Sequence, residues 1–201
     1  MANKAAGIEI LEEFYNKNLP LFTPQAEAMI DRVSPDKFNQ MAFRYTFSVE
    51  AMVKVSNIIE NAVLANSDVA DFHVSFQYLS RMLKQINRYE EITKHARGMW
   101  LYFAADTALA AGESVLSSPR VTVLDTADTP LLQYWFVVAY GPGVHMSLLA
   151  KEIASFDGSD RYYEGYYTFE KQAAYQLLTV LHQVYPREVP RPIKPELMRD
   201  R

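Results

Sequence analysis

Residues 133–140 read QYWFVVAY, a run in which nearly every side chain is apolar or aromatic. In an extended chain these side chains alternate between two sides: Tyr134, Phe136 and Val138 on one, and Trp135, Val137 and Ala139 on the other. A strand with two apolar faces is covered on both sides. The run therefore predicts a central strand with a packed layer against each of its faces.

Other short runs rich in β-branched and aromatic residues are separated by Gly, Pro, Asp and Ser, which is typical of strands. They are MWLYFAA (99–105), VTVL (121–124), VHMSLLAKEI (144–153) and YYEGYYTF (162–169). The third fits a strand or a short helix, and the short Gly141-Pro142-Gly143 turn before it favours a returning strand. In 162–169, alternation directs Tyr163, Tyr167 and Phe169 into the core, and Gly165 indicates a bulge or a close backbone approach.

Apolar residues at three- and four-residue steps predict helices at 5–17 and 72–86 and across RYEEITKHA (88–96), the last ended by Gly98. Capping and proline signals predict four more helices: QAEAMIDRV (25–33) after Thr23-Pro24, DKFNQMAFRY (36–45) after Ser34-Pro35, a helix from Ser48 to about Leu64, and a final one capped by Thr168 and ended by Pro186. The first helices either cover the sheet or contact a partner, and covering is the simpler interpretation.

The order of helices, then strands, then a helix predicts an α+β domain. We expect a mostly antiparallel sheet of about five strands in the C-terminal half, packed with helices and preceded by an N-terminal helical region. Four prolines in PREVPRPIKPELMRDR (186–201) predict an extended tail that contributes little to the core.

Composition excludes several classes of function. The 201 residues carry a net charge of −4, which argues against direct nucleic-acid binding, and the absence of cysteine excludes disulfides, thiolate nucleophiles and iron–sulfur clusters. Glu9, Glu12 and Glu13 lie where a signal peptide would be apolar, and no later run approaches a membrane span. We therefore expect a cytoplasmic protein that does not insert into a membrane.

No catalytic constellation is visible in the sequence. The four histidines are far apart, and the only local donor cluster, Asp68, Asp71 and His73, precedes a predicted helix, which favours capping over a metal site. With seven glycines the chain has no phosphate-binding loop, and no serine lies in a nucleophile elbow. Glu152 and Glu164 would form a carboxylate pair only if their strands were neighbours. The sequence predicts no catalytic residue, metal or cofactor.

Four segments together resemble the DICT sensory domain, which is found with diguanylate cyclases and two-component systems. They are FHVSFQYLSRMLKQINRYEEI (72–92), MWLYFAAD (99–106), TPLLQYWFVVAYGPGVHMSLLAKEI (129–153) and RYYEGYYTFE (161–170). The matching motifs are Arg88-Tyr89, Asp106, Trp135 to Val138, Leu148 to Glu152 and Tyr163 to Phe169. The resemblance covers about residues 48–186 and divides the chain into a helical arm (1–47), a DICT-like domain (48–186) and a proline-rich tail (187–201).

The resemblance implies a non-enzymatic sensory or regulatory module that acts through protein–protein contacts, in light-responsive or cyclic-dinucleotide signalling. Its expected partners are a signalling protein and a second copy of itself. The alternative is a protein that binds a small ligand or chromophore in an aromatic pocket between sheet and helices. The candidate ligand-binding residues are Arg88, Tyr102, Trp135, Glu152, Glu164 and Tyr166.

Overall fold

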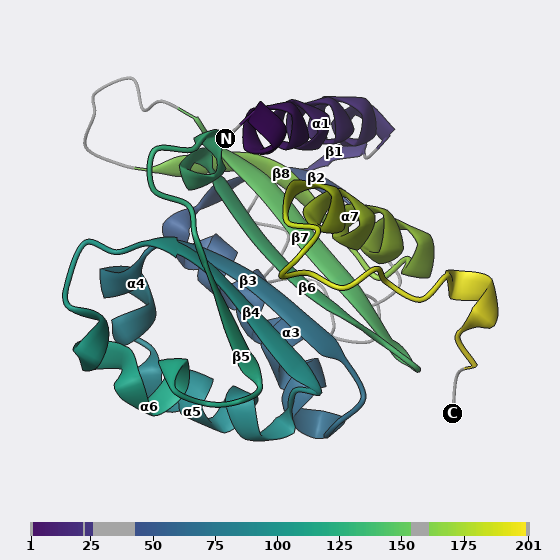
Figure 1. The fold of residues 1–201 in the computed structure, drawn as a ribbon. Helices are drawn as coiled ribbons and strands as arrows, with labels where there is room; N and C mark the ends of the chain where they lie inside the picture. The colour runs from purple at the N-terminus through teal and green to yellow at the C-terminus, as the bar shows by residue number, and fades with distance from the viewer. Residues whose placement is uncertain (1, 22, 26–42, 154–160, 200–201) are drawn as a thin grey trace.

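A mixed β-sheet runs through the whole molecule in the computed structural model, which describes residues 2–21, 23–25, 43–153 and 161–199. Its strands lie in the order β1-β2-β8-β7-β6-β3-β4-β5 (Figure 1). They are β1 Thr23–Gln25, β2 Phe43–Ser48, β3 Asp71–Tyr78, β4 Gly98–Ala104, β5 Val121–Asp125, β6 Tyr134–Gly141, β7 Val144–Ile153 and β8 Tyr162–Thr168. The described helices are α1 Ala2–Asn18, α3 Val49–Ala65, α4 Leu79–Leu83, α5 Ile86–His95, α6 Glu113–Leu116 and α7 Lys171–Val184.

The α+β class is confirmed, but the predicted size and direction of the sheet were wrong. Seven strands have five or more residues, and the three-residue β1 adds an eighth at one edge. The strands from β2 through β8, β7 and β6 to β3 are antiparallel, whereas β1–β2, β3–β4 and β4–β5 are parallel. β3, β4 and β5 are parallel because helical crossovers connect them, α4 and α5 between β3 and β4 and the α6 region between β4 and β5. The prediction of a mostly antiparallel sheet assumed hairpin connections instead.

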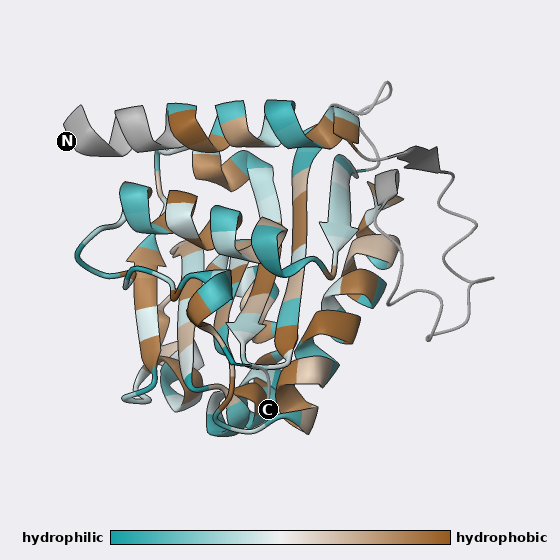
Figure 2. Ribbon diagram, turned by 90° about the vertical axis from the view of Figure 1, so that its right-hand side faces the viewer, coloured by the Kyte–Doolittle hydropathy of each residue, from teal (hydrophilic) through white to brown (hydrophobic). Residues whose placement is uncertain are grey.

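Strand β6 is central and covered on both faces, as its sequence predicts. Trp135, Val137 and Ala139 contact the core layer under α3 and α5, and Phe136 and Val138 contact the layer under α1 and α7. The strands lie between the two helical layers, and both strands and helices mix hydrophobic and hydrophilic positions (Figure 2). The sheet therefore separates two cores.

The N-terminal helix packs on its own domain, as the covering interpretation expects. Leu11 and Tyr15 of α1 are buried in the core beneath α7, and the Tyr15 hydroxyl donates to the Glu164 carbonyl oxygen at 2.5 Å. Lys151 Nζ of β7 forms an ion pair with Glu12 Oε1 at 2.5 Å. These contacts fix α1 across β7 and β8.

The helix predicted at 72–86 was wrong, because residues 71–78 form strand β3. All six residues from Phe72 to Gln77 are buried, since this strand lies between β6 and β4 with both of its faces covered. Apolar residues on both faces of a strand also fall at three- and four-residue steps, so the spacing of Phe72, Phe76 and Leu79 did not separate the two structures. The helical part of this segment is limited to the short α4 and the start of α5.

Several predicted element ends were also corrected. The Ser48 cap is confirmed, since its hydroxyl accepts from the Ala51 N–H at 3.2 Å, but Glu170 and not Thr168 precedes α7. Gly98 opens β4 without a left-handed backbone, and α5 ends before it at His95. The predicted helix at 25–33 begins where Thr23–Gln25 is a strand, and the end of 36–45 belongs to β2. The remaining residues of these two predicted helices lie outside the described part of the chain.

The C-terminal tail is extended, but it contributes to the core more than its prolines predict. It crosses the face of the sheet beside α7 (Figure 1) and buries Val189 and Met198. The Tyr140 hydroxyl donates to the Ile193 carbonyl oxygen at 2.7 Å, and the Trp100 indole N–H donates to the Glu188 carbonyl oxygen at 2.8 Å. Two strands therefore hold the tail against the sheet.

Gly165 in β8 lies where two backbones approach closely. A Cβ atom at this position would lie 2.3 Å from the Leu149 carbonyl oxygen and 2.5 Å from Ala150 Cα. The pairing of β8 with both β2 and β7 continues through Gly165 without a shift. Of the two interpretations of this glycine, the close approach is the correct one.

We expect Gly165→Ala to lower the free energy of unfolding by about 2 kcal/mol or more, because rigid backbone atoms must move to accept the methyl group. Denaturant unfolding measures the change. Gly143→Asn is the control, since Gly143 has a φ of 75° with open space around it and asparagine tolerates that backbone. An alanine variant as stable as the parent protein would contradict the close approach.

Candidate functional site

The carboxyl end of β3 contains a backbone irregularity at a buried residue. The pairing of β3 with β4 shifts between Ser75 and Gln77, and Gln77 has a φ of 63°, a left-handed conformation that only a few per cent of non-glycine residues adopt. Gln77 is only 2% exposed. Strained residues of this kind persist where their surroundings hold them, and they are concentrated at functional sites.

Side chains of β3 replace the backbone ladder at this end of the strand. The backbones of β3 and β6 pair from Asp71 only as far as Val74. Beyond it, the Ser75 hydroxyl donates to the Tyr134 carbonyl oxygen at 3.0 Å and accepts from the Phe136 N–H at 2.9 Å. The Gln77 amide donates to the Leu132 carbonyl oxygen at 2.5 Å. β3 therefore separates from β6, while it still pairs with β4, without leaving these groups of β6 and the preceding turn unpaired.

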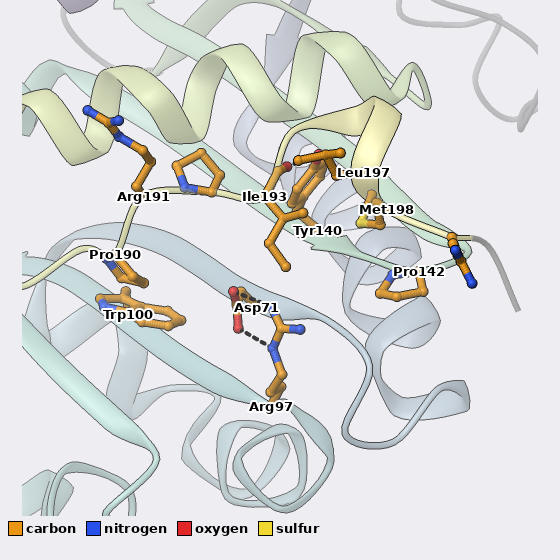
Figure 3. Close-up of a pocket in the computed structure, with 12 residues that line it drawn as sticks. Asp71, Arg97, Trp100, Tyr140, Pro142, Pro190, Arg191, Ile193, Leu197 and Met198 are labelled. Atoms are coloured by element: carbon orange, nitrogen blue, oxygen red, sulfur yellow. Dashed lines mark hydrogen bonds and ion pairs between the residues drawn. The ribbon is translucent and has the colours of Figure 1, made fainter.

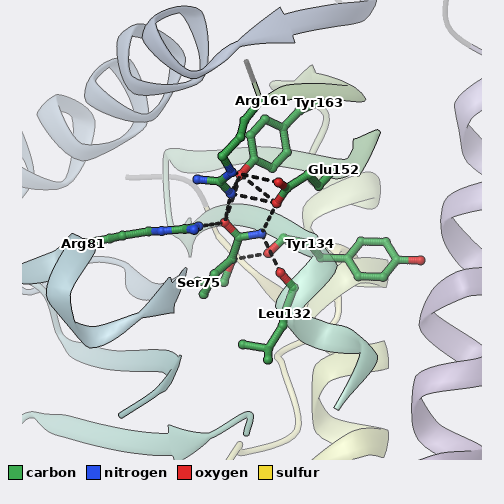
Figure 4. Close-up of polar contacts among 8 residues, drawn as sticks. Ser75, Arg81, Leu132, Tyr134, Glu152, Arg161 and Tyr163 are labelled. Carbon is green, nitrogen blue, oxygen red and sulfur yellow. Dashed lines mark hydrogen bonds and ion pairs between the residues drawn. The ribbon is translucent and has the colours of Figure 1, made fainter. Parts of the chain in front are cut away.

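The Gln77 side chain also bonds to every other member of a charged network, and its partners are labelled in Figure 4. Its Oε1 accepts from Arg81, from Arg161 Nη2 at 2.7 Å and from the Tyr163 hydroxyl at 2.9 Å. Its Nε2 donates to Glu152 Oε2 at 3.0 Å. We call Gln77, Arg81, Glu152, Arg161 and Tyr163 the Gln77 network; they come from β3, α4, β7, the residue before β8 and β8 itself.

Glu152 and Arg161 form the ion pair of this network. Both Glu152 oxygens accept from Arg161, at 2.7 Å each. These hydrogen bonds lower the pKa of the Glu152 carboxyl below its ordinary value, although partial burial opposes them. Burial raises the pKa of Tyr163 to about 12, so this residue donates as a neutral phenol. At neutral pH the network contains two guanidinium groups and one carboxylate.

Asp106, a residue of the DICT-like pattern, lies close to this network. Its carboxylate accepts from the Ser80 N–H at 2.9 Å and from the Ser80 hydroxyl at 2.5 Å, at the start of α4. The hydrogen bonds from Ser80 lower the pKa of Asp106, and the charge of Arg81 lowers it further. Asp106 thus fixes the chain immediately after the left-handed Gln77.

A pocket of about 460 Å³ lies at the opposite end of the same strands, between the sheet and the C-terminal tail (Figure 3). An ion pair of Arg97 with Asp71 forms part of its lining, with Nη2 to Oδ2 at 2.6 Å. Trp100, Tyr140, and apolar and basic residues of the tail complete it: Pro190, Arg191, Pro192, Ile193, Leu197, Met198 and Arg199, with Pro142 from the β6–β7 turn. A volume of this size suits a small organic molecule.

His73 supports the pocket from inside the sheet. Its ring stacks on Trp100 with centroids 4.3 Å apart and planes inclined by 3°, and its Nδ1 lies 3.0 Å from the Tyr102 hydroxyl. Burial lowers the pKa of His73 to about 3, so the ring is neutral at physiological pH. The interpretation of Asp68, Asp71 and His73 as helix caps was wrong, because Asp71 and His73 belong to a strand and Asp68 pairs with Arg120. Within the described ranges no group of histidine and acidic residues could hold a metal ion.

The structure separates the six predicted ligand-binding residues. Tyr102 and Tyr166 are fully buried under α1 and α7, whereas Trp135 packs on the opposite face, against Ser56 of α3. Arg88 lies on α5, where it binds Glu60 and donates to Asn61 Oδ1 at 2.9 Å. A single pocket lined by these four residues therefore does not exist.

Glu152 and Glu164 do not form a carboxylate pair either. Glu152 pairs across the strands with Tyr163, so its side chain is on the face opposite that of the neighbouring Glu164. Glu152 belongs to the Gln77 network, and the backbone of Glu164 accepts from Tyr15. Sequence reasoning found Glu152 but missed Gln77, Arg81 and Arg161, because their proximity depends on contacts between residues up to 84 positions apart.

A comparison with protein families matches residues 38–153 to the DICT domain, described as a sensory domain in diguanylate cyclases and two-component systems. The chain belongs to the DICT sensory domain family. The DICT match spans β2 to β7 and includes Gln77, Arg81, Asp106 and Glu152, while Arg161 and Tyr163 follow it. No curated protein and no solved structure matches the chain. None of the described helices is long and apolar enough to cross a membrane.

We expect the stability of this DICT protein to fall as the pH drops from about 6.5 towards 5. In the folded protein burial lowers the pKa of His73 to about 3, whereas in the unfolded chain the ring takes up a proton near its ordinary pKa of 6.5. Stability from the neutral ring is complete above that value and is lost below it, by about 1.4 kcal/mol per pH unit. Denaturant unfolding between pH 5 and 8 measures the slope. The Glu152 carboxyl, whose pKa is lowered, stays ionised over this pH range and does not contribute to the slope.

The His73→Gln variant loses this slope, and the His145→Gln control keeps it. The same slope in both variants would show that the loss of stability does not arise from His73.

Proposed function

We propose that this DICT protein is a non-enzymatic sensory module that acts through protein–protein contacts. The family match supports a role in signalling, and the pocket beneath the C-terminal tail supplies a place for an input. The tail forms most of the pocket wall, so a bound molecule contacts the sheet and the tail at the same time. The proposal therefore rests on the observation that sheet and tail residues line the same pocket.

The tail is suited to transmit the bound state. Its attachment between Glu188 and Ile193 depends on hydrogen bonds from Trp100 and Tyr140, both of which line the pocket. Two apolar side chains of the tail are available to a partner, since Ile193, at the end of this attachment, is 50% exposed and Leu197, beyond it, is 72% exposed. A ligand that changes how the tail lies on the sheet thereby changes an apolar surface at the end of the protein.

The proposal includes the setting that the family suggests. We place the protein in the cytoplasm, in a light-responsive or cyclic-dinucleotide pathway, with a signalling protein and a second copy of itself as partners. The division into arm (1–47), DICT domain (48–186) and tail (187–201) remains a prediction. The candidate binding residues move from the six expected ones to the pocket residues, above all Trp100.

A second function, that of a ligand- or chromophore-binding protein without a signalling partner, is favoured by the same pocket. The stacked Trp100 indole offers an aromatic wall, and the Asp71–Arg97 ion pair offers polar groups that orient a ligand. The two functions share the binding step and differ only in whether the tail contacts another protein.

Native mass spectrometry of the protein purified from its own cells tests the binding step. We expect a small molecule that is retained in the native state, released on unfolding and unchanged in mass after incubation with the protein. Trp100→Ala should lose it, because Trp100 lines the pocket, whereas Trp135→Phe should keep it, because Trp135 lies on the opposite face. The absence of a retained molecule, or equal retention in both variants, would contradict the proposal.

A further inference from the structure

Two arginines at the other end of β3 share a single neutral acceptor. Arg81 from α4 and Arg161, directly before β8, both donate to Gln77 Oε1. Figure 4 shows the two arginine side chains converging from different directions. Like charges at this separation repel each other, and burial, together with the charge of Arg161, lowers the pKa of Arg81. The amide oxygen of Gln77 carries only a partial charge, so it does not neutralise either guanidinium.

The one carboxylate of the Gln77 network is already occupied. Glu152 accepts twice from Arg161 and once from Gln77. Among the described residues no carboxylate lies within ion-pair distance of Arg81, and the nearby Asp106 is bound to Ser80. The network thus has one positive charge in excess, on a half-buried side chain.

Both arginines also keep unused donors. The hydrogen bonds of Arg81 to described residues involve Nη1 alone, and those of Arg161 involve Nε and Nη2. Nε and Nη2 of Arg81 and Nη1 of Arg161 therefore have no acceptor within the described part of the chain. The side chains of Arg161 and Glu152 are 32% and 31% exposed, so solutes reach the network.

We propose that Arg81 and Arg161 together bind the phosphate group of a small phosphorylated molecule. A phosphate has several oxygens and up to two negative charges, which match two guanidinium groups with free N–H donors better than a single carboxylate does. Gln77 positions both arginines, and its left-handed backbone directs its side chain into the network. Gln77 and Asp71 lie at opposite ends of β3, so this site is separate from the pocket beneath the tail and does not depend on it.

Isothermal titration calorimetry at constant ionic strength tests the site, with inorganic phosphate and glycerol 3-phosphate as probes. We expect saturable binding of at least one probe, weakened tenfold or more in Arg81→Gln and less in Arg81→Lys, which keeps the charge. Arg187→Gln is the matched control, since Arg187 is exposed on the tail outside the network. Equal affinity for the two probes identifies the phosphate group alone as the ligand, and tighter binding of the ester identifies a phosphorylated metabolite.

Nitrogen-15 NMR of the arginine side chains gives a second readout that needs no substitution in the network. The Nε–H signals of Arg81 and Arg161 should shift with a common saturation curve during the phosphate titration, while the signal of Arg187 stays in place. The absence of saturable binding, unchanged affinity in Arg81→Gln, or equal shifts for all arginines would overturn the proposal.

Discussion

The left-handed backbone of Gln77 is the constraint on which the carboxyl end of the sheet depends. It shifts the parallel pairing of β3 with β4, which continues only to Tyr78 before the chain turns into α4. A glutamine in this conformation is unfavourable by itself, and the side-chain contacts with β7, β8 and the residues before β6 compensate for it. Backbone geometry and side-chain chemistry at one residue thus hold together four segments that are distant in sequence.

The two ends of β3 lie among different side chains. At one end the tail closes over Trp100 and the Asp71–Arg97 ion pair, and Arg191 and Arg199 of the tail add basic groups to a lining that is otherwise mostly apolar. At the other, two guanidinium groups and one carboxylate leave a positive excess. Both proposed sites include a residue of β3, Asp71 at one end and Gln77 at the other, so this strand connects them.

Helices and strands were predicted correctly from the sequence where the spacing of apolar residues fits only one kind of element. β6, with two apolar faces, and the alternating β8 were correctly placed, and so were α1, α3 and α7. β3 was mistaken for a helix because a strand buried on both faces has no period-two polarity to identify it. The candidate site was predicted only at Glu152, since a glutamine gives no local sign that its φ is positive or that two arginines converge on it.

The free energy of unfolding of Gln77→Ala and Gln77→Gly tests the central claim, because the two variants separate the backbone from the side chain. Both lose the network, which leaves buried polar groups without partners, at about 1–3 kcal/mol for each such group. Only glycine adopts φ near 63° freely, so it should recover about 1 kcal/mol relative to alanine. We expect both variants to be destabilised, alanine more than glycine. A glycine variant as stable as the parent protein would show that the side chain of Gln77 does not hold the site together.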